Sequence, residues 1–353
     1  MTTWPIVSVL IPARDEEQDI GACLEAIAKQ DYPVNLLEVI VIDGASTDRT
    51  LEVTRGVLRR YGFGSTAVLH NEEGSTPSNL NLGLARATGE IVCRVDARTR
   101  VEPHHVRTCV EVLTSRPDVV VVGGAQVAVA RDRTALSVGI ARALNNRWSM
   151  GGSPYRRATR SRPSDTVYLG AFRTQQLKDA GGWDERFPTN QDFELNRRLG
   201  GGGTVWFESS LRSGYLPRSS LVRLWAQYRR FGRAKVRYWR TTGDRPRPRQ
   251  WALLCVPPVA AVCWIVALVL LPTPLRLALV ALTALGLLAV EVSGADEPPA
   301  SVAGHLVGVG AVPIVGFGWW YGVVTAALSL TGRAEAPVDP TAAGSASEAP
   351  PGA

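Results

Sequence analysis

The sequence predicts an α/β fold with a mainly parallel sheet, followed by helices that cross a membrane. Short apolar runs alternate with charged, amphipathic stretches through residues 1–210, which is the pattern of a sheet covered by helices on both faces. Charge then nearly vanishes across residues 251–330. Three apolar stretches there, 251–271, 275–292 and 302–330, are each about as long as a membrane-spanning helix. The length of 353 residues agrees with about two domains.

The first elements follow from apolar runs, helical periodicity and turn residues. Residues 6–11 form an apolar strand closed by Pro12, and the helix 15–30 carries Ile20, Leu24 and Ile27 on one face. A helix at 78–87 ends before Gly89. The other strands of this part are expected at 39–42, 67–70, 91–95 and 119–122, and the other helices at 48–61 and 103–115.

The later elements are less regular in sequence. Residues 131–162 have weak periodicity and several Gly, Ser and Arg residues, so we expect a mobile loop over the site. Strands are expected at 166–172 and 204–207, with the helix that contains Asp192 between them. A final amphipathic helix at 221–239 has apolar residues at three-to-four spacing among arginines, which suits a membrane interface or packing against the soluble domain.

The chain therefore divides into four segments. We expect a soluble domain at 1–218, a basic amphipathic segment at 219–250, a membrane domain of about three helices at 251–331, and a disordered tail at 332–353. The net charge of +7 is concentrated just before the first span. Basic residues beside a span mark the cytoplasmic side and attract anionic lipids, and this position favours lipid over nucleic acid as their partner.

Acidic residues come directly after two of the expected strands. Asp43 and Asp96 each end an apolar run, and Asp192 lies about a hundred residues further on. Ligands of an open parallel sheet bind beyond the carboxyl ends of its strands, where a carboxylate meets a nucleobase, a ribose hydroxyl or a metal ion. Acids at such ends are also common turn formers. The Gly-rich turn of a dinucleotide-binding domain is missing after the first strand, which argues against a dehydrogenase.

Four segments in order resemble glycosyltransferase family 2, whose members have the GT-A fold. They are VSVLIPARDEE at 7–17, VIVIDGASTDRT at 39–50, NQDFELNRR at 190–198 and QYRRFGRA at 227–234. The last two are similar to the bacterial membrane enzymes of the succinoglycan-biosynthesis type. The resemblance covers residues 5–240 and the arrangement of the carboxy-terminal helices.

The resemblance implies a pocket for a nucleotide-sugar donor, such as a UDP- or GDP-sugar. Asp43 matches the acid that binds the base of the nucleotide. Pro12, Ala13 and Glu17 match residues that line the same pocket, and Asn79 lies where the family's helix passes the ribose.

The resemblance also implies a metal site and a catalytic base. Asp96 matches the first acid of the DxD motif, which holds a divalent cation, Mg²⁺ or Mn²⁺, on the diphosphate. Arg98 stands at the third position of that motif in place of an acid: either it faces the phosphates directly, or the metal is held by fewer protein ligands. Asp192 matches the general base of inverting members, although Gln191 replaces the glutamate that usually precedes it. Asp192 in a purely structural role, as a helix cap or a surface acid, is the alternative.

Gln227 and Arg230 match the QxxRW motif, with Phe231 for the tryptophan, and would hold the diphosphate and the acceptor near the membrane. We therefore expect an inverting glycosyltransferase of the bacterial inner membrane, with its catalytic domain in the cytoplasm and a lipid-linked saccharide as acceptor. The alternatives are a transferase acting on bare polyprenyl phosphate and a degenerate domain that serves as a sensor or scaffold.

Overall fold

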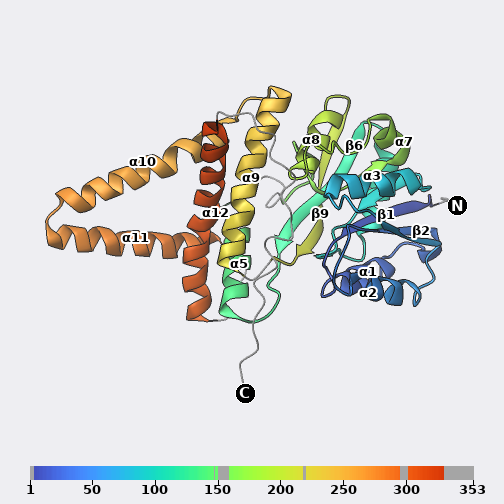
Figure 1. Ribbon diagram of the computed structural model, residues 1–353, viewed down its shortest axis with the longest axis horizontal. Helices are drawn as coiled ribbons and strands as arrows, with labels where there is room; N and C mark the ends of the chain where they lie inside the picture. Colours follow the sequence, from blue (N-terminus) through green and yellow to red (C-terminus); the bar gives the residue numbers. More distant parts are fainter. Residues whose placement is uncertain (1–3, 147, 150–158, 218–219, 295–300, 330–353) are drawn as a thin grey trace, which may run out of the picture.

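A computed structural model describes residues 4–146, 148–149, 159–217, 220–294 and 301–329 (Figure 1). One mixed sheet organises its first part, with the strand order β3-β2-β1-β4-β8-β6-β9-β5, and β7 pairs with β9 at the side. The expected α/β class and the mainly parallel sheet are confirmed. The expected tail at 332–353 lies outside the described residues.

The amino-terminal half of the sheet is parallel. It consists of β1 (Val7–Ala13), β2 (Leu37–Asp43), β3 (Ser65–His70) and β4 (Ile91–Arg94). Their apolar runs are the strands that the sequence predicts. Because these strands are parallel, their carboxyl ends meet at one edge, and the residues just after each strand share that edge.

The second half of the sheet is mixed. The strand β8 (Tyr168–Arg173) runs antiparallel to both β4 and β6 (Val119–Ala128), and β6 pairs in parallel with the long strand β9 (Thr204–Tyr215). Two strands of two residues each, β5 (Thr99–Arg100) and β7 (Arg162–Pro163), pair with β9. The sequence did not predict these two, because a two-residue strand carries no periodicity.

Helices cover both faces of the sheet (Figure 1). One core contains apolar residues of α1 (Ile20–Ala28), α2 (Thr50–Leu58) and α4 (His105–Ser115). The core on the opposite face contains residues of α3 (Thr76–Arg86), α7 (Thr174–Asp179) and α8 (Gln191–Leu199). The short 3-10 helix η1 (Val34–Leu36) leads into β2. A layer of helices therefore closes each side and leaves the strand ends open.

A third core joins the first part of the chain to its carboxy-terminal helices. It contains residues of α5 (Ala135–Asn145), α9 (Leu221–Thr242) and α12 (Val302–Leu328). The expectation of a mobile loop at 131–162 is therefore wrong for its first half, which is helical and packs against α12. Residues 150–158 of that stretch lie outside the described residues. The weak periodicity of residues 131–162 does not predict α5, because its apolar residues pack against α12, more than 150 residues further along the chain.

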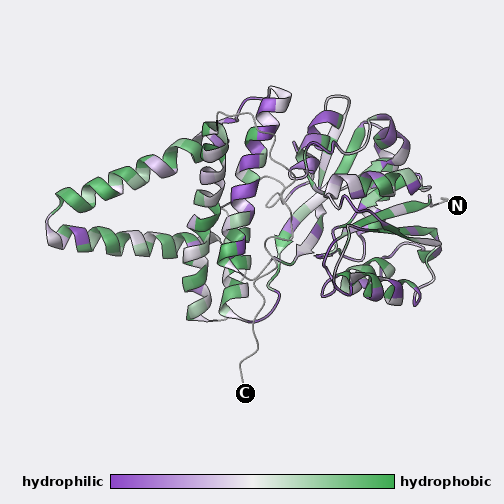
Figure 2. Cartoon of the chain, in the orientation of Figure 1, coloured by the Kyte–Doolittle hydropathy of each residue, from purple (hydrophilic) through white to green (hydrophobic). Residues whose placement is uncertain are grey.

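The remaining helices, α10 (Pro248–Leu270) and α11 (Thr273–Gly294), project from the rest of the molecule as a hydrophobic hairpin (Figure 2). Together with α12 they are the three helices of the described chain that are long and apolar enough to cross a membrane. The three apolar stretches expected from the sequence are thus confirmed as helices.

Glycine permits a very close approach of α12 to α9. A Cβ at Gly322 would collide with the backbone carbonyl of Arg229, whereas a Cβ at Gly316 would meet no atom within 4 Å. We expect Gly322→Ala to lower the thermal unfolding midpoint in detergent, at a cost of about 1–3 kcal/mol from overpacking. Gly316→Ala, the matched control on the same helix, should leave the midpoint unchanged or raise it slightly. Equal midpoints for the two variants would contradict this packing.

Candidate functional site

The carboxyl ends of β1, β2 and β3 bring the residues expected at the nucleoside side together. In the parallel register Ala13 pairs with Asp43, and Asp43 pairs with His70. Asp43 is fully buried, and its carboxylate accepts a hydrogen bond from the backbone N–H of Ser46 at 3.2 Å and lies 3.1 Å from Nδ1 of His70. Pro12 precedes Ala13 on β1. The structure thus adds to this edge His70, which no sequence motif marks.

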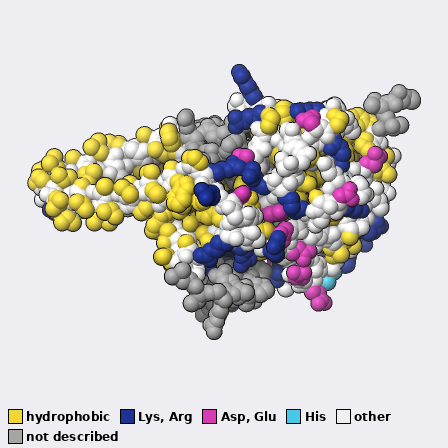
Figure 3. Space-filling model, turned by 90° about the horizontal axis from the view of Figure 1, so that it is seen from above, with side chains coloured by type: hydrophobic (Ala, Val, Ile, Leu, Met, Phe, Trp, Pro, Cys, Tyr) yellow, Lys and Arg dark blue, Asp and Glu magenta, His cyan; other side chains and the backbone are white. Residues whose placement is uncertain are grey.

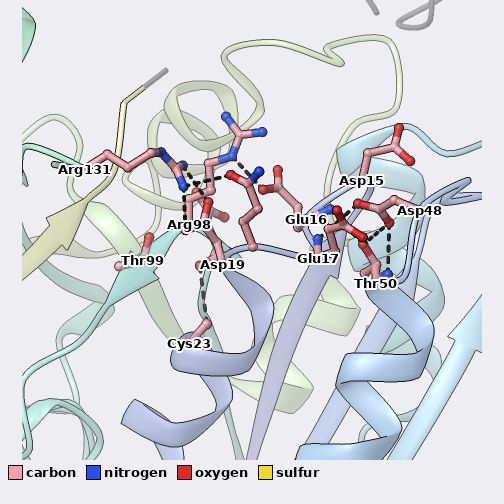
Figure 4. Close-up of polar contacts among 12 residues, drawn as sticks. Asp15, Glu16, Glu17, Asp19, Cys23, Asp48, Thr50, Arg98, Thr99 and Arg131 are labelled. Carbon is pink, nitrogen blue, oxygen red and sulfur yellow. Dashed lines mark hydrogen bonds and ion pairs between the residues drawn. The ribbon is translucent and has the colours of Figure 1, made fainter. Parts of the chain in front are cut away.

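The loops after β1 and β2 brace one another above this edge (Figure 4). The backbone N–H of Asp15 donates to Oγ of Ser46 at 3.0 Å, and that of Glu17 donates to Oδ2 of Asp48 at 3.1 Å. The Glu17 carboxylate in turn accepts a hydrogen bond from the backbone N–H of Arg49 at 3.1 Å. Glu17 is therefore a residue of the brace between the two loops, and its contact with a nucleotide stays a prediction.

Asn79 lies under the turn after Asp43. It is on α3, 2% exposed, and its Oδ1 accepts a hydrogen bond from Nδ2 of Asn71 at 2.8 Å. A Cβ at Gly44 would lie 2.9 Å from Nδ2 of Asn79, so glycine allows the turn to approach the helix. Asn79 therefore supports the turn after Asp43, and its contact with a ribose stays a prediction.

Asp96 and Asp192 meet through Arg94, a residue that the sequence motifs do not single out. Nε of Arg94 donates to Oδ1 of Asp96 at 2.9 Å, and its Nη1 pairs with Oδ1 of Asp192. The Arg94 side chain is 5% exposed, whereas the two carboxylates keep about a third of their surface exposed. One guanidinium therefore joins the loop after β4 to the first turn of α8.

A signal for Arg94 does exist in the sequence. It stands inside the apolar run IVCRV of a strand that is expected to be buried. Arginine is almost never fully buried without a charged partner, because removing its charge from water is costly. The rule predicts a nearby carboxylate, but it does not say which one.

The environment of Asp192 changes its acidity. Burial raises the pKa of the Asp192 carboxyl above its ordinary value, Arg94 opposes this rise, and the nearby Asp96 carboxylate adds to it. A carboxylate of raised pKa is a better proton acceptor near neutral pH. Asp192 is thus suited to the role of a general base that the resemblance assigns to it.

Arg98 is held by an acid of the first loop. Its Nε donates to Oε2 of Glu16 at 2.7 Å, and the side chain is 15% exposed (Figure 4). Arg98 comes two residues after Asp96 in the chain. Its guanidinium is therefore positioned by Glu16, and contact with phosphates remains a prediction.

The long helix α9 reaches the site through residues other than the expected pair. Gln227 is half-buried and Arg230 is exposed. Further along the helix, Nζ of Lys235 lies 3.2 Å from the ring centre of Phe193, and the ring of Tyr238 packs edge-on against the same ring at 5.1 Å. Phe193 is next to Asp192 in the chain, so this half of α9 supports α8, the helix that contains Asp192. Burial lowers the pKa of Lys235 to about 7.

The residues around Asp96 do not fit a divalent cation held by protein side chains. Mg²⁺ and Mn²⁺ favour several oxygen ligands, most of them carboxylates or water. Oδ1 of Asp96 is engaged by the positive charge of Arg94, and Oδ2 lies 3.5 Å from the hydroxyl of Tyr168. Among the described residues no group of three His, Cys, Asp or Glu side chains is placed to hold a metal ion.

Comparisons with known proteins concern the family and the fold. The family model described as "Glycosyl transferase family 2" matches residues 8–172, from β1 to β8. A dolichyl N-acetyl-α-D-glucosaminyl phosphate 3-β-D-2,3-diacetamido-2,3-dideoxy-β-D-glucuronosyltransferase of Methanococcus voltae is 29% identical over 65% of this chain and 72% of its own length. The succinoglycan biosynthesis protein ExoA of Rhizobium meliloti is 28% identical over 71% of this chain and 76% of its own length.

A solved structure shares the whole architecture. It is the mannosyltransferase PcManGT from Pyrobaculum calidifontis, solved in complex with GDP-Man and Mn²⁺. The TM-score is 0.63 at 20% identity, and the match covers 94% of this chain and 89% of that one, so the likeness includes the carboxy-terminal helices. The matched segments and the shared architecture lead to one conclusion: residues 8–172 of this chain form a domain of glycosyltransferase family 2, and the chain is a glycosyltransferase with the GT-A fold.

Proposed function

We propose that this enzyme transfers a sugar from a nucleoside diphosphate donor to a hydroxyl of a lipid-linked saccharide, with inversion at the anomeric carbon. The centre formed by Arg94, Asp96 and Asp192 carries the proposal. Asp96 lies just after β4 and Asp43 ends β2, with β1 between these strands. Two strand spacings of about 4.8 Å each therefore separate Asp43 from Asp96. This span suits a nucleoside at Asp43 and the reacting sugar at the centre that contains Asp96 and Asp192.

In the proposed reaction Asp192 removes the proton from the acceptor hydroxyl. The acceptor oxygen forms a bond to the anomeric carbon while the bond from that carbon to the diphosphate breaks, and its electron pair leaves with the nucleoside diphosphate. Arg94 keeps Asp192 ionised and fixes its direction. A correctly oriented base lowers the barrier because the reacting groups need no further ordering.

The mechanism contains no step through a divalent cation, because the residues around Asp96 do not supply a set of oxygen ligands. Dependence on Mg²⁺ or Mn²⁺ stays a prediction from the family resemblance. So do the contacts of Arg98, Gln227 and Arg230 with the donor or the acceptor.

The acceptor is proposed from membrane attachment and from relatives. The name of the Methanococcus voltae relative specifies a dolichyl-phosphate-linked sugar, and that of the Rhizobium meliloti relative specifies succinoglycan biosynthesis. Apolar helices would hold the catalytic domain at the bilayer, which raises the effective concentration of a lipid acceptor. We assign the enzyme to the inner membrane with its catalytic domain in the cytoplasm, where the basic residues of α9 meet anionic lipids.

Replacement of the base separates donor binding from turnover. We expect Asp192→Asn to lower kcat by roughly 10²–10⁴-fold, the usual contribution of a general base, with little change in the Kd of the donor. Sugar release from a panel of UDP- and GDP-sugars, with and without Mn²⁺, measures kcat. Calorimetric titration measures the Kd of the donor.

Asp179→Asn, on the exposed end of α7, is the matched control and should behave as the parent enzyme. The panel is run with polyprenyl phosphate and with lipid-linked saccharides as acceptors. Transfer to the bare lipid phosphate would instead favour a polyprenyl-phosphate glycosyltransferase. Donor binding without turnover in the parent enzyme would favour a sensor or scaffold.

Removal of the guanidinium should move the pH dependence. Arg94 lowers the pKa of Asp192, so Arg94→Met should raise that pKa further, because the charge partner is lost. Because the base acts only when ionised, the acid limb of the kcat profile should move to higher pH by the same amount. Arg186→Met, which breaks the exposed pair of Arg186 with Asp184, is the control. An unmoved acid limb in Arg94→Met would exclude Asp192 as the titrating base.

A further inference from the structure

The hairpin of α10 and α11 has the surface of a segment that crosses a bilayer. Between Gln250 and Ser293 the only charged residues are Arg276, near the turn, and Glu291, near the base. Figure 3 shows the hairpin as a hydrophobic projection, with dark blue basic side chains gathered where it meets the rest of the molecule. Each candidate span has 21 residues, which give a helix about 32 Å long, enough for a hydrocarbon core of about 30 Å.

The third apolar helix, α12, has a different environment. A third of its most apolar window is buried within the protein, against 0% for α10 and 6% for α11. In Figure 1 it runs across the base of the hairpin, beside α9 and α5. Its first part meets α5, where a Cβ at Gly139 would lie 2.6 Å from Val307, and its later part meets α9.

The contact with α9 is close and continuous. The two helices run in parallel: Gly318 faces Trp225, Gly322 faces the carbonyl of Arg229, and Nη2 of Arg240 donates to the carbonyl of Ala327 at 3.1 Å. Wherever α12 lies relative to the membrane, the second half of α12 and the facing part of α9 must therefore lie at the same depth.

The depth of α9 is fixed by its other contacts and by its charges. Lys235 and Tyr238 pack on Phe193 of α8, beside the catalytic centre, which must be open to water. Exposed arginines recur along the helix at Arg223, Arg230, Arg237 and Arg240. Charged side chains are costly inside hydrocarbon, so α9 cannot accompany a helix through the bilayer.

We propose that α10 and α11 alone cross the membrane and that α12 lies along its surface beside α9. The two helices then form one surface against an anionic bilayer. The α9 arginines meet the lipid head groups, and the exposed apolar side chains of α12 enter the boundary of the hydrocarbon: Val302, Leu306, Phe317, Tyr321 and Leu328. With two crossings, the catalytic domain and Ser329 lie on the same side of the membrane.

Thiol labelling of the full chain in cells tests this arrangement. In a background carrying Cys255→Ser and Cys263→Ser, which removes the two exposed native thiols, single cysteines are placed by Thr273→Cys at the hairpin turn and Ser329→Cys after α12. Gln175→Cys on α7 marks the side of the catalytic domain. Each variant is treated with a membrane-impermeant maleimide before and after permeabilisation.

We expect Ser329→Cys to label together with Gln175→Cys, and Thr273→Cys to label from the opposite side. Labelling of Ser329→Cys together with Thr273→Cys would show that α12 crosses, and labelling of all three from one side would show that the hairpin does not cross. An affinity tag added to the carboxyl terminus provides a second readout, independent of any cysteine. Protease should remove the tag only in vesicles in which it also digests the catalytic domain. Removal of the tag from vesicles whose catalytic domain stays protected would overturn the proposal.

Discussion

A single buried guanidinium, that of Arg94, organises the proposed catalytic centre. Two carboxylates that approach one another where little water remains repel strongly, and the repulsion falls when a positive charge stands between them. Arg94 has this place between Asp96 and Asp192. Because Asp96 lies just after β4 and Asp192 is in the first turn of α8, the ion pairs of Arg94 also fix α8 to the centre of the sheet. The position and the acidity of Asp192 thus have the same origin.

Much of the sheet could be predicted from the sequence, because β1 to β4 are continuous apolar runs and parallel strands bring the residues at their carboxyl ends to one edge. The proximity of Asp43 to Ala13 is a consequence of that register. The pairing of Arg94 with Asp192 was not predictable, since it joins residues 98 positions apart and many acids are possible partners. The helix α5 was not predictable for a similar reason, because its apolar residues are buried by α12, which is far away in the sequence.

The packing of the helices crosses the boundary expected at residue 218. A single core contains Ile140 and Leu144 of α5, Tyr228 of α9, and Val315 and Trp319 of α12. The catalytic part and the carboxy-terminal part are therefore continuous, although composition divides the chain sharply between them. Composition shows which side chains are hydrophobic. The depth of a helix in a bilayer depends also on the helices against which it packs.

Ion pairs join the base of the α10–α11 hairpin to α5 and α12. Glu291 of α11 pairs with Nε of Arg142 on α5 at 2.5 Å and with Nδ1 of His305 on α12 at 2.6 Å. Breaking a buried ion pair leaves an uncompensated charge, so the hairpin and α5 move as one body. In the proposed arrangement the height of Asp192 above the bilayer is then fixed by the protein. The proposed lipid-linked acceptor would react only if its hydroxyl lies at that height while its lipid tail stays in the membrane.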